Sequence, residues 1–298
     1  MTVRLAVPLS HLEGLSGPAQ ADLLAITTAA ERGGADQLVL SEHVALGSVL
    51  DGHPGAGGRF PFDADEEYPD PLVALAAVTA LTTTVRLSTN ILIAPLRPAV
   101  LLAKLVATLD VLSHGRVDLG LGAGWYEGEF AAIGVPVEER EARLEDTVRA
   151  CRALWAGGPA TFASASVSFD GLVCSPSPVQ PGGPPVWLGG GATRRTARKV
   201  AAFGDGWTVM GDATPDDIAA GAALIAEACE RVDRDPNPLT IRCSLRPVGG
   251  DLDRTMAQAA AYVEAGASVV QLPSLRAFTR DVADVEAVVR AARSLLPG

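Results

Sequence analysis

Short apolar runs with strand character alternate with longer segments of helical spacing along the whole chain, and this alternation constrains the fold most. The first pair is a strand over Val3–Pro8 and a helix over Ala19–Arg32 that stops at Gly33-Gly34. Seven further pairs have strands over 37–41, 85–94, 116–120, 186–188, 207–210, 239–245 and 268–272, each followed by helical material. Eight such pairs of uniform composition favour a closed parallel (β/α)8 TIM barrel of the α/β class over an open doubly wound sheet.

Chain length agrees with one barrel domain over residues 1–298. Two segments stand outside the repeating pairs: an extended loop after the second strand, Leu46–Tyr68, and a Pro- and Gly-rich insertion after the fourth helix, Gly157–Pro185. The loop carries Phe60, Phe62 and Tyr68. It either closes over an apolar substrate or lacks order without one.

Charge and composition exclude several classes of function. The chain has 24 Lys and Arg against 35 Asp and Glu, and its net charge of −11 opposes binding to nucleic acid or to an anionic membrane. The N-terminus enters a strand without a secretory signal, and the apolar segment Leu72–Leu81 is too short to span a membrane. The four cysteines have no spacing typical of a zinc site or a redox pair. We therefore expect a cytoplasmic protein with buried thiols, no metal and a small-molecule substrate.

The second strand ends in Ser41-Glu42-His43, at the edge where a parallel barrel builds its active site. A histidine here can move a proton during hydride transfer, because imidazole is the side chain whose charge ordinarily changes near neutral pH. A structural histidine bonded to a backbone carbonyl is the alternative. Glu42 either orients that imidazole or is solvated, and strand alternation points the two neighbouring side chains to opposite sides. His11, just beyond the first strand, could also reach the mouth of the barrel.

The third strand is apolar except for Ser88-Thr89-Asn90. Buried polar groups need hydrogen-bond partners, so Asn90 either lies beneath a planar ligand or caps a bulge in the strand.

The fourth strand ends in Gly120-Leu121-Gly122-Ala123-Gly124-Trp125, where Trp125 replaces the last glycine of a dinucleotide-binding loop. The glycines either let the backbone approach a flat ring, with Trp125 as a wall of the same pocket, or allow tight packing at the barrel rim.

The fifth strand ends in Gly189-Gly190-Gly191, and the next helix opens with Thr193-Arg194-Arg195. Exposed amides, the positive end of a helix dipole and guanidinium groups together indicate a phosphate site. A simple glycine-rich turn is the alternative.

Several motifs occur in one characteristic order: Ser41-Glu42-His43, Pro69-Asp70-Pro71, Leu96-Arg97-Pro98, Leu109–Ser113, Gly115-Arg116-Val117, Gly120–Glu129, Trp187–Gly191 and Phe203–Trp207. In this order the chain closely resembles the bacterial-luciferase-like flavoprotein superfamily, and within it the F420-dependent oxidoreductase branch. The resemblance covers essentially the whole chain and is sharpest over Leu38–Gly134.

The resemblance implies a barrel with an isoalloxazine-type ring across its mouth and the coenzyme phosphate at the fifth strand-to-helix junction. It assigns catalysis to His43, helped by Glu42, and a non-proline cis peptide to Asn90-Ile91. Coenzyme binding then falls to the residues at the strand ends: Asn90, Ile91, Ala123, Gly124, Trp125, Gly189, Gly190, Gly191, Thr193 and Arg194. Several relatives carry a glutamate near Trp125, so a proton-transfer role at that position is absent or moved.

We expect an oxidoreductase that transfers a hydride between coenzyme F420 and a small organic substrate, as a homodimer. The first alternative is an FMN-dependent two-component monooxygenase with a separate reductase. The second is a flavin-binding protein without catalysis, because a fold does not guarantee an activity.

Overall fold

The computed structural model describes residues 2–12, 15, 19–47, 50, 60, 66–237 and 239–297. Its main sheet contains β1 (Arg4–Pro8), β2 (Gln37–Leu40), β3 (Arg86–Thr89), β4 (Leu92–Ile93), β5 (Val117–Gly122), β8 (Val186–Gly190), β9 (Gly206–Val209), β10 (Thr240–Ser244) and β11 (Val269–Gln271). These strands pair in the order β3-β2-β1-β11-β10-β9-β8-β5-β4. A parallel pairing of β3 with β5 closes the ring, and β4 continues the position of β3, so the eight-position parallel barrel is confirmed.

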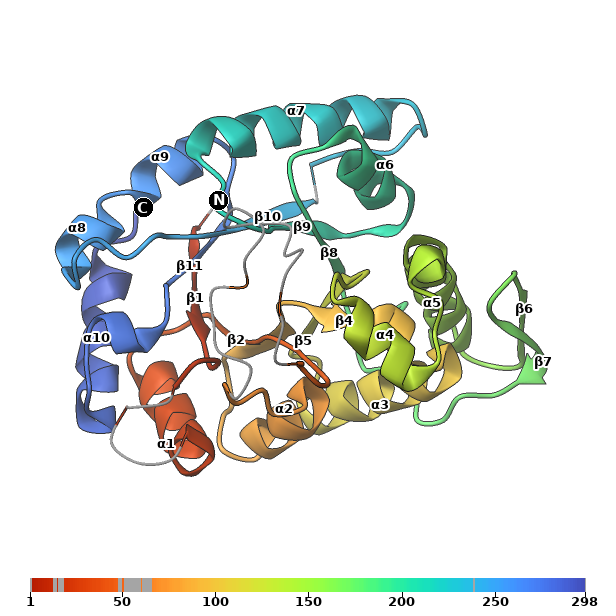
Figure 1. The fold of residues 1–298 in the computed structure, drawn as a ribbon, viewed down its shortest axis with the longest axis horizontal. Helices are drawn as coiled ribbons and strands as arrows, with labels where there is room; N and C mark the ends of the chain where they lie inside the picture. Colours follow the sequence, from red (N-terminus) through yellow and green to blue (C-terminus); the bar gives the residue numbers. More distant parts are fainter. Residues whose placement is uncertain are drawn as a thin grey trace.

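Helices surround the strands (Figure 1). They are α1 (Ala19–Arg32), α2 (Pro71–Thr79), α3 (Ala99–Leu112), α4 (Glu127–Ile133), α5 (Arg140–Trp155), α6 (Arg194–Phe203), α7 (Pro215–Glu230), α8 (Leu252–Met256), α9 (Ala259–Glu264) and α10 (Val285–Ser294), with short 3-10 turns η2 (Ala94–Leu96), η3 (Val137–Glu139), η4 (Leu275–Ala277) and η5 (Val282–Asp284). Their starts follow from the sequence, because Asp70 caps α2 ahead of Pro71 and Thr214 caps α7 ahead of Pro215. Within the described ranges, no helix has the length and apolar character that a membrane span requires.

The structure departs from the sequence prediction in three places. The strand expected over 85–94 is divided into β3 and β4 at a cis Asn90-Ile91 bond. The helix expected over 252–264 is divided into α8 and α9, where the Gln258 side chain donates to the backbone oxygens of Arg246 and Thr255. The insertion after the fourth helix contains an antiparallel hairpin, β6 (Ala160–Ala163) and β7 (Ser168–Leu172), which projects at the right of Figure 1.

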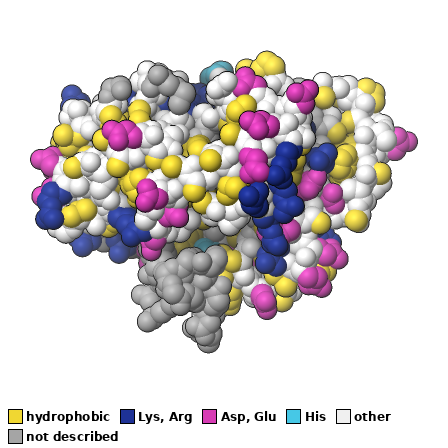
Figure 2. Space-filling model, turned by 90° about the horizontal axis from the view of Figure 1, so that it is seen from above, with side chains coloured by type: hydrophobic (Ala, Val, Ile, Leu, Met, Phe, Trp, Pro, Cys, Tyr) yellow, Lys and Arg dark blue, Asp and Glu magenta, His cyan; other side chains and the backbone are white. Residues whose placement is uncertain are grey.

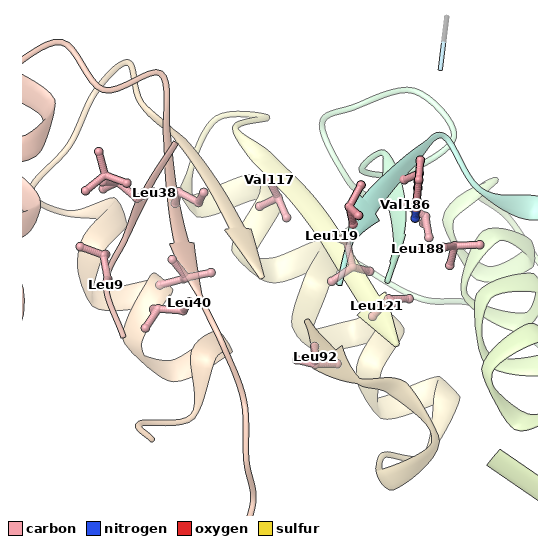
Figure 3. Packing of buried hydrophobic residues seen from close by; sticks show 14 of the residues in the cluster. Leu9, Leu38, Leu40, Leu92, Val117, Leu119, Leu121, Val186 and Leu188 are labelled. Atoms are coloured by element: carbon pink, nitrogen blue, oxygen red, sulfur yellow. The ribbon is translucent and has the colours of Figure 1, made fainter. Parts of the chain in front are cut away.

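Alternation along the strands separates two cores. Leucine and valine side chains on the outer side of the barrel pack against the helices, among them Leu38, Leu40, Val117, Leu119, Leu121, Val186 and Leu188 (Figure 3). The other parity points into the barrel, where a small apolar cluster of Ala6, Val39, Trp187 and Val269 lies beside buried polar side chains, including Gln37, Ser88, Asp118, Thr208 and Arg242. This polar cluster includes Gln37 and Asp118 at the starts of β2 and β5, and Thr208 farther along β9.

Three of the predicted buried thiols, Cys151, Cys229 and Cys243, are buried, and Cys174 is half-buried.

Candidate active site

His43 lies just beyond β2, and a buried carboxylate holds its imidazole. Oε2 of Glu129, on α4, is 3.2 Å from Nδ1 of His43, and the two side chains are only 10% and 0% exposed. Nε2 of His43 has no hydrogen-bond partner among the described residues. A carboxylate at Nδ1 keeps a proton on that nitrogen, so Nε2 is the atom that can accept or donate a proton.

Glu129 also fixes the chain that follows His43. Its Oε1 accepts the backbone amides of Val44, at 2.5 Å, and Ala45, at 3.3 Å. One turn earlier on the chain, the hydroxyl of Tyr126 accepts the amide of Gly47 at 3.1 Å. The beginning of α4 therefore positions both the imidazole and the first residues of the loop after β2.

The expectation that Glu42 orients His43 is wrong. Glu42 is buried with 5% exposure, and its Oε2 accepts the amide of Ile93 at 2.6 Å while Oε1 pairs with Arg97 at 2.5 Å. Burial raises the pKa of Glu42, and Arg97 opposes that shift. The parity of β2 explains the arrangement, because Glu42 continues the outward side of Leu38 and Leu40 whereas His43 continues the inward side. Glu42 thus ties β2 to β4 and η2.

Aromatic rings enclose His43. The rings of Phe60, Tyr68 and Trp125 each meet the imidazole edge to face, with centroids 5.1, 5.0 and 5.9 Å away. Trp125 therefore lies beside His43, and its predicted place in the wall of a coenzyme pocket stays a prediction. Phe62 and most of the loop Leu46–Tyr68 lie outside the described residues, so its predicted closure over a substrate stays a prediction.

His11 contacts one of the same aromatic rings, that of Tyr68. The two ring centroids are 5.2 Å apart, and Nδ1 of His11 is 3.1 Å from Oε1 of Glu66. Tyr68 thus separates the two histidines, and the expectation that His11 reaches the mouth is compatible with this position.

The cis peptide expected at Asn90-Ile91 is present. The Asn90 side chain joins three strands across the barrel, because its Oδ1 accepts the hydroxyl of Thr208 at 2.8 Å and its Nδ2 donates to Gln271 at 3.3 Å. The backbone amide of Asn90 donates to Leu40 at 2.7 Å, three residues before His43. Asn90 therefore links the β2 side of the mouth to β9 and β11, and it does not cap a bulge.

The glycines in the last part of β5 and just beyond it leave space that other parts of the protein occupy. An added Cβ on Gly120 would lie 1.9 Å from the carbonyl oxygen of Thr89, and one on Gly122 would lie 2.6 Å from Ile91. Gly124 has a φ of +81°, and an added Cβ there would meet Ile93 and Phe130.

Ala123 is half-buried and packs against the outer core. Tight packing, rather than the approach of a flat ring, explains this run, so direct coenzyme contacts at Ala123 and Gly124 have no support here.

The three glycines at the end of β8 differ in the space around them, and the last of them, Gly191, lies just beyond the strand. A Cβ on Gly189 would meet Ile91 at 2.8 Å, and one on Gly190 would meet the Thr196 hydroxyl at 2.6 Å. Gly191 is open, with its nearest atom, Cγ2 of Thr193, at 4.0 Å. Thr193 caps α6 by accepting the amide of Thr196. Within the described chain, the amides of Gly191, Arg194 and Arg195 donate no hydrogen bond, as an anion-binding helix start requires.

The guanidinium of Arg194 does not belong to this group of donors. It is 67% exposed and pairs with Glu227 of α7 at 3.2 Å. Arg194, Arg198 and Arg231 line a groove of about 140 Å³ between α6 and α7. Figure 2, seen from the side on which α7 lies in Figure 1, shows a prominent group of Lys and Arg side chains right of the centre, with others scattered on the left. Of Arg194, the backbone amide belongs to the group of free donors, whereas the guanidinium pairs with Glu227.

The arrangement fits a planar, phosphate-bearing coenzyme. Free amides at the start of α6 suit a phosphate, and Asn90, Ile91 and Trp125 surround the strand ends between that helix and His43. Ile91 contacts both Gly122 and Gly189, so it lies between the β5 and β8 sides of the mouth. The predicted residues of these two sides thus come together at one end of the barrel.

Two residues with evident roles escaped the sequence prediction. Glu129 lies in a motif that the resemblance included, but nothing in its spacing pointed to His43. Arg242 is a lone arginine inside the apolar strand over 239–245, which is itself a signal for a special role.

Comparison with known proteins gives one family. The model of the luciferase-like monooxygenase family matches residues 3–293. An uncharacterized protein of Mycobacterium bovis is 33% identical over 231 residues, which cover 71% of this chain and 80% of that protein. An FMNH(2)-dependent dimethylsulfone monooxygenase of Pseudomonas fluorescens is 36% identical over 176 residues, 55% of this chain and 47% of that enzyme.

Solved structures share the fold at low identity. An F420-dependent secondary alcohol dehydrogenase, in complex with an F420-acetone adduct, has a TM-score of 0.79 at 16% identity, with all of both chains covered. The oxygenating constituent of 3,6-diketocamphane monooxygenase from Pseudomonas putida, in complex with FMN, has a TM-score of 0.75 at 13% identity, with 100% and 99% covered. The barrel is thus shared with proteins of both coenzyme types.

Proposed function

Because the chain belongs to the luciferase-like monooxygenase family, we propose that it is an oxidoreductase that uses coenzyme F420 for hydride transfer with a small organic substrate. The observation that carries this proposal is the His43–Glu129 pair at the barrel mouth. Hydride transfer to or from a carbon that bears oxygen or nitrogen also requires a proton at that atom, and an oriented imidazole supplies or removes it. The fold is shared with an F420-dependent alcohol dehydrogenase and is therefore compatible with this coenzyme.

In this proposal, each side of the mouth has its own task. A bound deazaflavin supplies the hydride-transfer chemistry. Nε2 of His43 holds or releases the substrate proton, while Glu129 fixes the imidazole through Nδ1. The aromatic rings around His43 exclude water from the reacting atoms. The amides of Gly191, Arg194 and Arg195 hold the coenzyme phosphate.

A second candidate is an FMN-dependent monooxygenase that depends on a separate reductase. The dimethylsulfone monooxygenase of Pseudomonas fluorescens, matched over about half of its length, favours it. The same amides suit the phosphate of either coenzyme. A protein that binds a flavin without catalysis is the remaining alternative. We consider it less favoured, because mere binding does not require an oriented imidazole such as that of the His43–Glu129 pair.

The decisive experiment is an anaerobic titration of the purified protein with F420 and FMN side by side. We expect F420 to bind more tightly, and its chromophore to be lost or gained when a small organic substrate is added. Tight FMN binding without measurable F420 affinity contradicts the proposal. Oxygen uptake in the presence of a flavin reductase then identifies the monooxygenase.

Substitution of the acid–base pair tests the catalytic assignment. We expect His43→Ala to lower kcat by about 10²- to 10⁴-fold, since a general acid or base contributes that much. Glu129→Gln keeps the shape of the side chain but removes its charge, and we expect a smaller loss with a changed pH profile. His114→Asn, in an exposed turn after α3, is the matched control. An unchanged rate in His43→Ala removes the assignment.

We also propose that the protein forms a homodimer through the outer side of α3. Leu101, Leu105 and Leu112 follow helical spacing and are 51%, 39% and 53% exposed, and Val73 on the neighbouring α2 is 72% exposed. Lys104 is the charged residue exposed on this side of α3, and its amine donates to the carbonyl oxygen of Ser175. The leucines beside it carry no negative charge, so two copies with net charge −11 can approach each other here. Sedimentation should show a dimer that the double substitution Leu101→Glu and Leu105→Glu converts to a monomer. A monomeric unsubstituted protein contradicts this assembly.

A further inference from the structure

Arg242 is a buried guanidinium in the interior of the barrel. It is 1% exposed, and it donates to four oxygens of neutral groups. Its Nε donates to Thr208 at 3.1 Å, its Nη1 to Gln37 and Ser88, both at 2.9 Å, and its Nη2 to the carbonyl of Thr89 at 3.1 Å. Its carbon Cζ lies 5.2 Å from the ring centre of Trp187. These four hydrogen bonds go to neutral oxygens, so none of them neutralises the charge of the guanidinium.

The charge balance around Arg242 is positive. Within the described residues it makes no ion pair, and the carboxylate that acts on it, Asp118, pairs with Arg86 at 2.7 Å. Gln37 stands between Arg242 and Asp118, donating to that carboxylate at 2.7 Å. Arg4 adds a third cation, 5.5 Å from the ring of Trp187. Burial lowers the pKa of Arg242 to about 9, with Asp118 opposing and Arg4 assisting, so the group is still a cation at neutral pH.

This cation is connected directly to the mouth of the barrel. The hydroxyl of Thr208 accepts from Arg242 and donates to Oδ1 of Asn90 at 2.8 Å. The carbonyl that Nη2 holds belongs to Thr89, the residue before Asn90. Only Thr208 therefore separates Arg242 from the Asn90 side chain along these hydrogen bonds. Charges in such a buried interior are weakly screened.

We propose that Arg242 is a positioning residue whose uncompensated charge makes the barrel mouth bind the reduced form of the coenzyme in preference to the oxidised form. This inference rests on the proposed function. Hydride addition to a flavin or deazaflavin ring places negative charge on the pyrimidine part of the ring, and a fixed cation in a water-poor site stabilises that charge. A purely structural role for Arg242 affects both forms equally.

The test measures the dissociation constants of reduced and oxidised coenzyme separately, by anaerobic titration of folded, purified variants. We expect Arg242→Gln to weaken binding of the reduced form by about tenfold relative to the oxidised form. For a two-electron couple this corresponds to a midpoint potential about 30 mV lower. Arg242→Lys retains the charge and is expected to retain most of the preference.

A second substitution distinguishes charge from structure by its sign. Asp118→Asn removes the carboxylate that opposes Arg242 with little change of shape, so we expect a stronger preference for the reduced form. It also keeps the inference testable if Arg242→Gln does not fold. Thr208→Val removes the link to Asn90 but no charge, and we expect the ratio of the two constants to change less than about threefold.

The inference is overturned if Arg242→Gln leaves the ratio unchanged, if Asp118→Asn shifts it in the same direction as Arg242→Gln, or if Thr208→Val shifts it equally far. Failure of the unsubstituted protein to bind either F420 or FMN overturns the proposed function instead, and with it this inference. An unaltered ratio in variants that bind the coenzyme overturns the inference alone.

Discussion

Two glycine-rich runs end neighbouring strands of this barrel, and they exist for different reasons. In the run that ends β5, only glycine fits, because Thr89, Ile91, Ile93 and Phe130 occupy the space that side chains would take. In the run that ends β8, the first two glycines also adjoin protein atoms, but Gly191, just beyond the strand, faces open space beside free amides. A run of glycines at a barrel mouth therefore does not by itself identify a ligand site. The unfilled space beside Gly191 is the feature that supports one.

The largest expected difference between the two runs is in stability. Gly120→Ala puts a methyl group 1.9 Å from a backbone oxygen, which cannot move aside as a flexible side chain can. We expect a loss of about 3 kcal/mol or more in the free energy of unfolding, measured by chemical denaturation. Gly191→Ala is the matched control, and we expect its stability to be nearly unchanged. Equal losses in both variants would remove the distinction between the runs.

The next effect is on coenzyme affinity at Gly191. A larger side chain at this position, as in Gly191→Val, obstructs the approach of a phosphate to the exposed amides. We expect the dissociation constant of the coenzyme to rise about tenfold, since a hydrogen bond to a charged group contributes about 1.5–3 kcal/mol. Isothermal titration measures the change. Unaltered affinity in a folded variant means that the phosphate lies elsewhere.

A smaller effect is expected at the cap of α6. Thr193→Ala removes the hydroxyl that accepts the amide of Thr196, and loss of such a cap costs about 1 kcal/mol. We expect a lower melting temperature and a several-fold weaker binding of coenzyme, because the first turn of the helix is less well fixed. Thr193→Ser retains the hydroxyl and should restore both values. If the serine variant behaves like the alanine variant, the cap is not the cause.

The smallest effect is expected at Arg194. Its guanidinium forms an exposed ion pair with Glu227, and such pairs contribute about 0–1 kcal/mol. We expect Arg194→Ala to change the coenzyme dissociation constant by less than about twofold. A rise of the dissociation constant by tenfold or more would show that the Arg194 side chain itself contacts the phosphate.

The sequence predicted the barrel well, because its regularity is local. Periodic apolar residues, Asp70 and Pro71 at one helix start and glycine stops are properties of neighbouring residues, and the bounds of α1 agree with the prediction. The division at Asn90-Ile91 has no such local signal, and it was expected only from the family resemblance.

The site was predicted less completely, since its key contacts join distant parts of the chain. His43 and Glu129 are 86 residues apart, and Arg242 and Ser88 are 154 apart. The adjacent Glu42 was the natural partner to expect for His43, yet strand parity sends it to Arg97. Individual side chains at the mouth could be predicted from the sequence. Which of them bind each other became visible only in the folded structure.

Glu129 binds the imidazole of His43 and the amides of Val44 and Ala45 at the same time. Anyone who exchanges the segment after β2 with that of a relative, in order to change which substrates enter, therefore also replaces part of the support of the histidine. A graft that starts beyond Ala45, or that transfers α4 along with the segment, leaves this support intact.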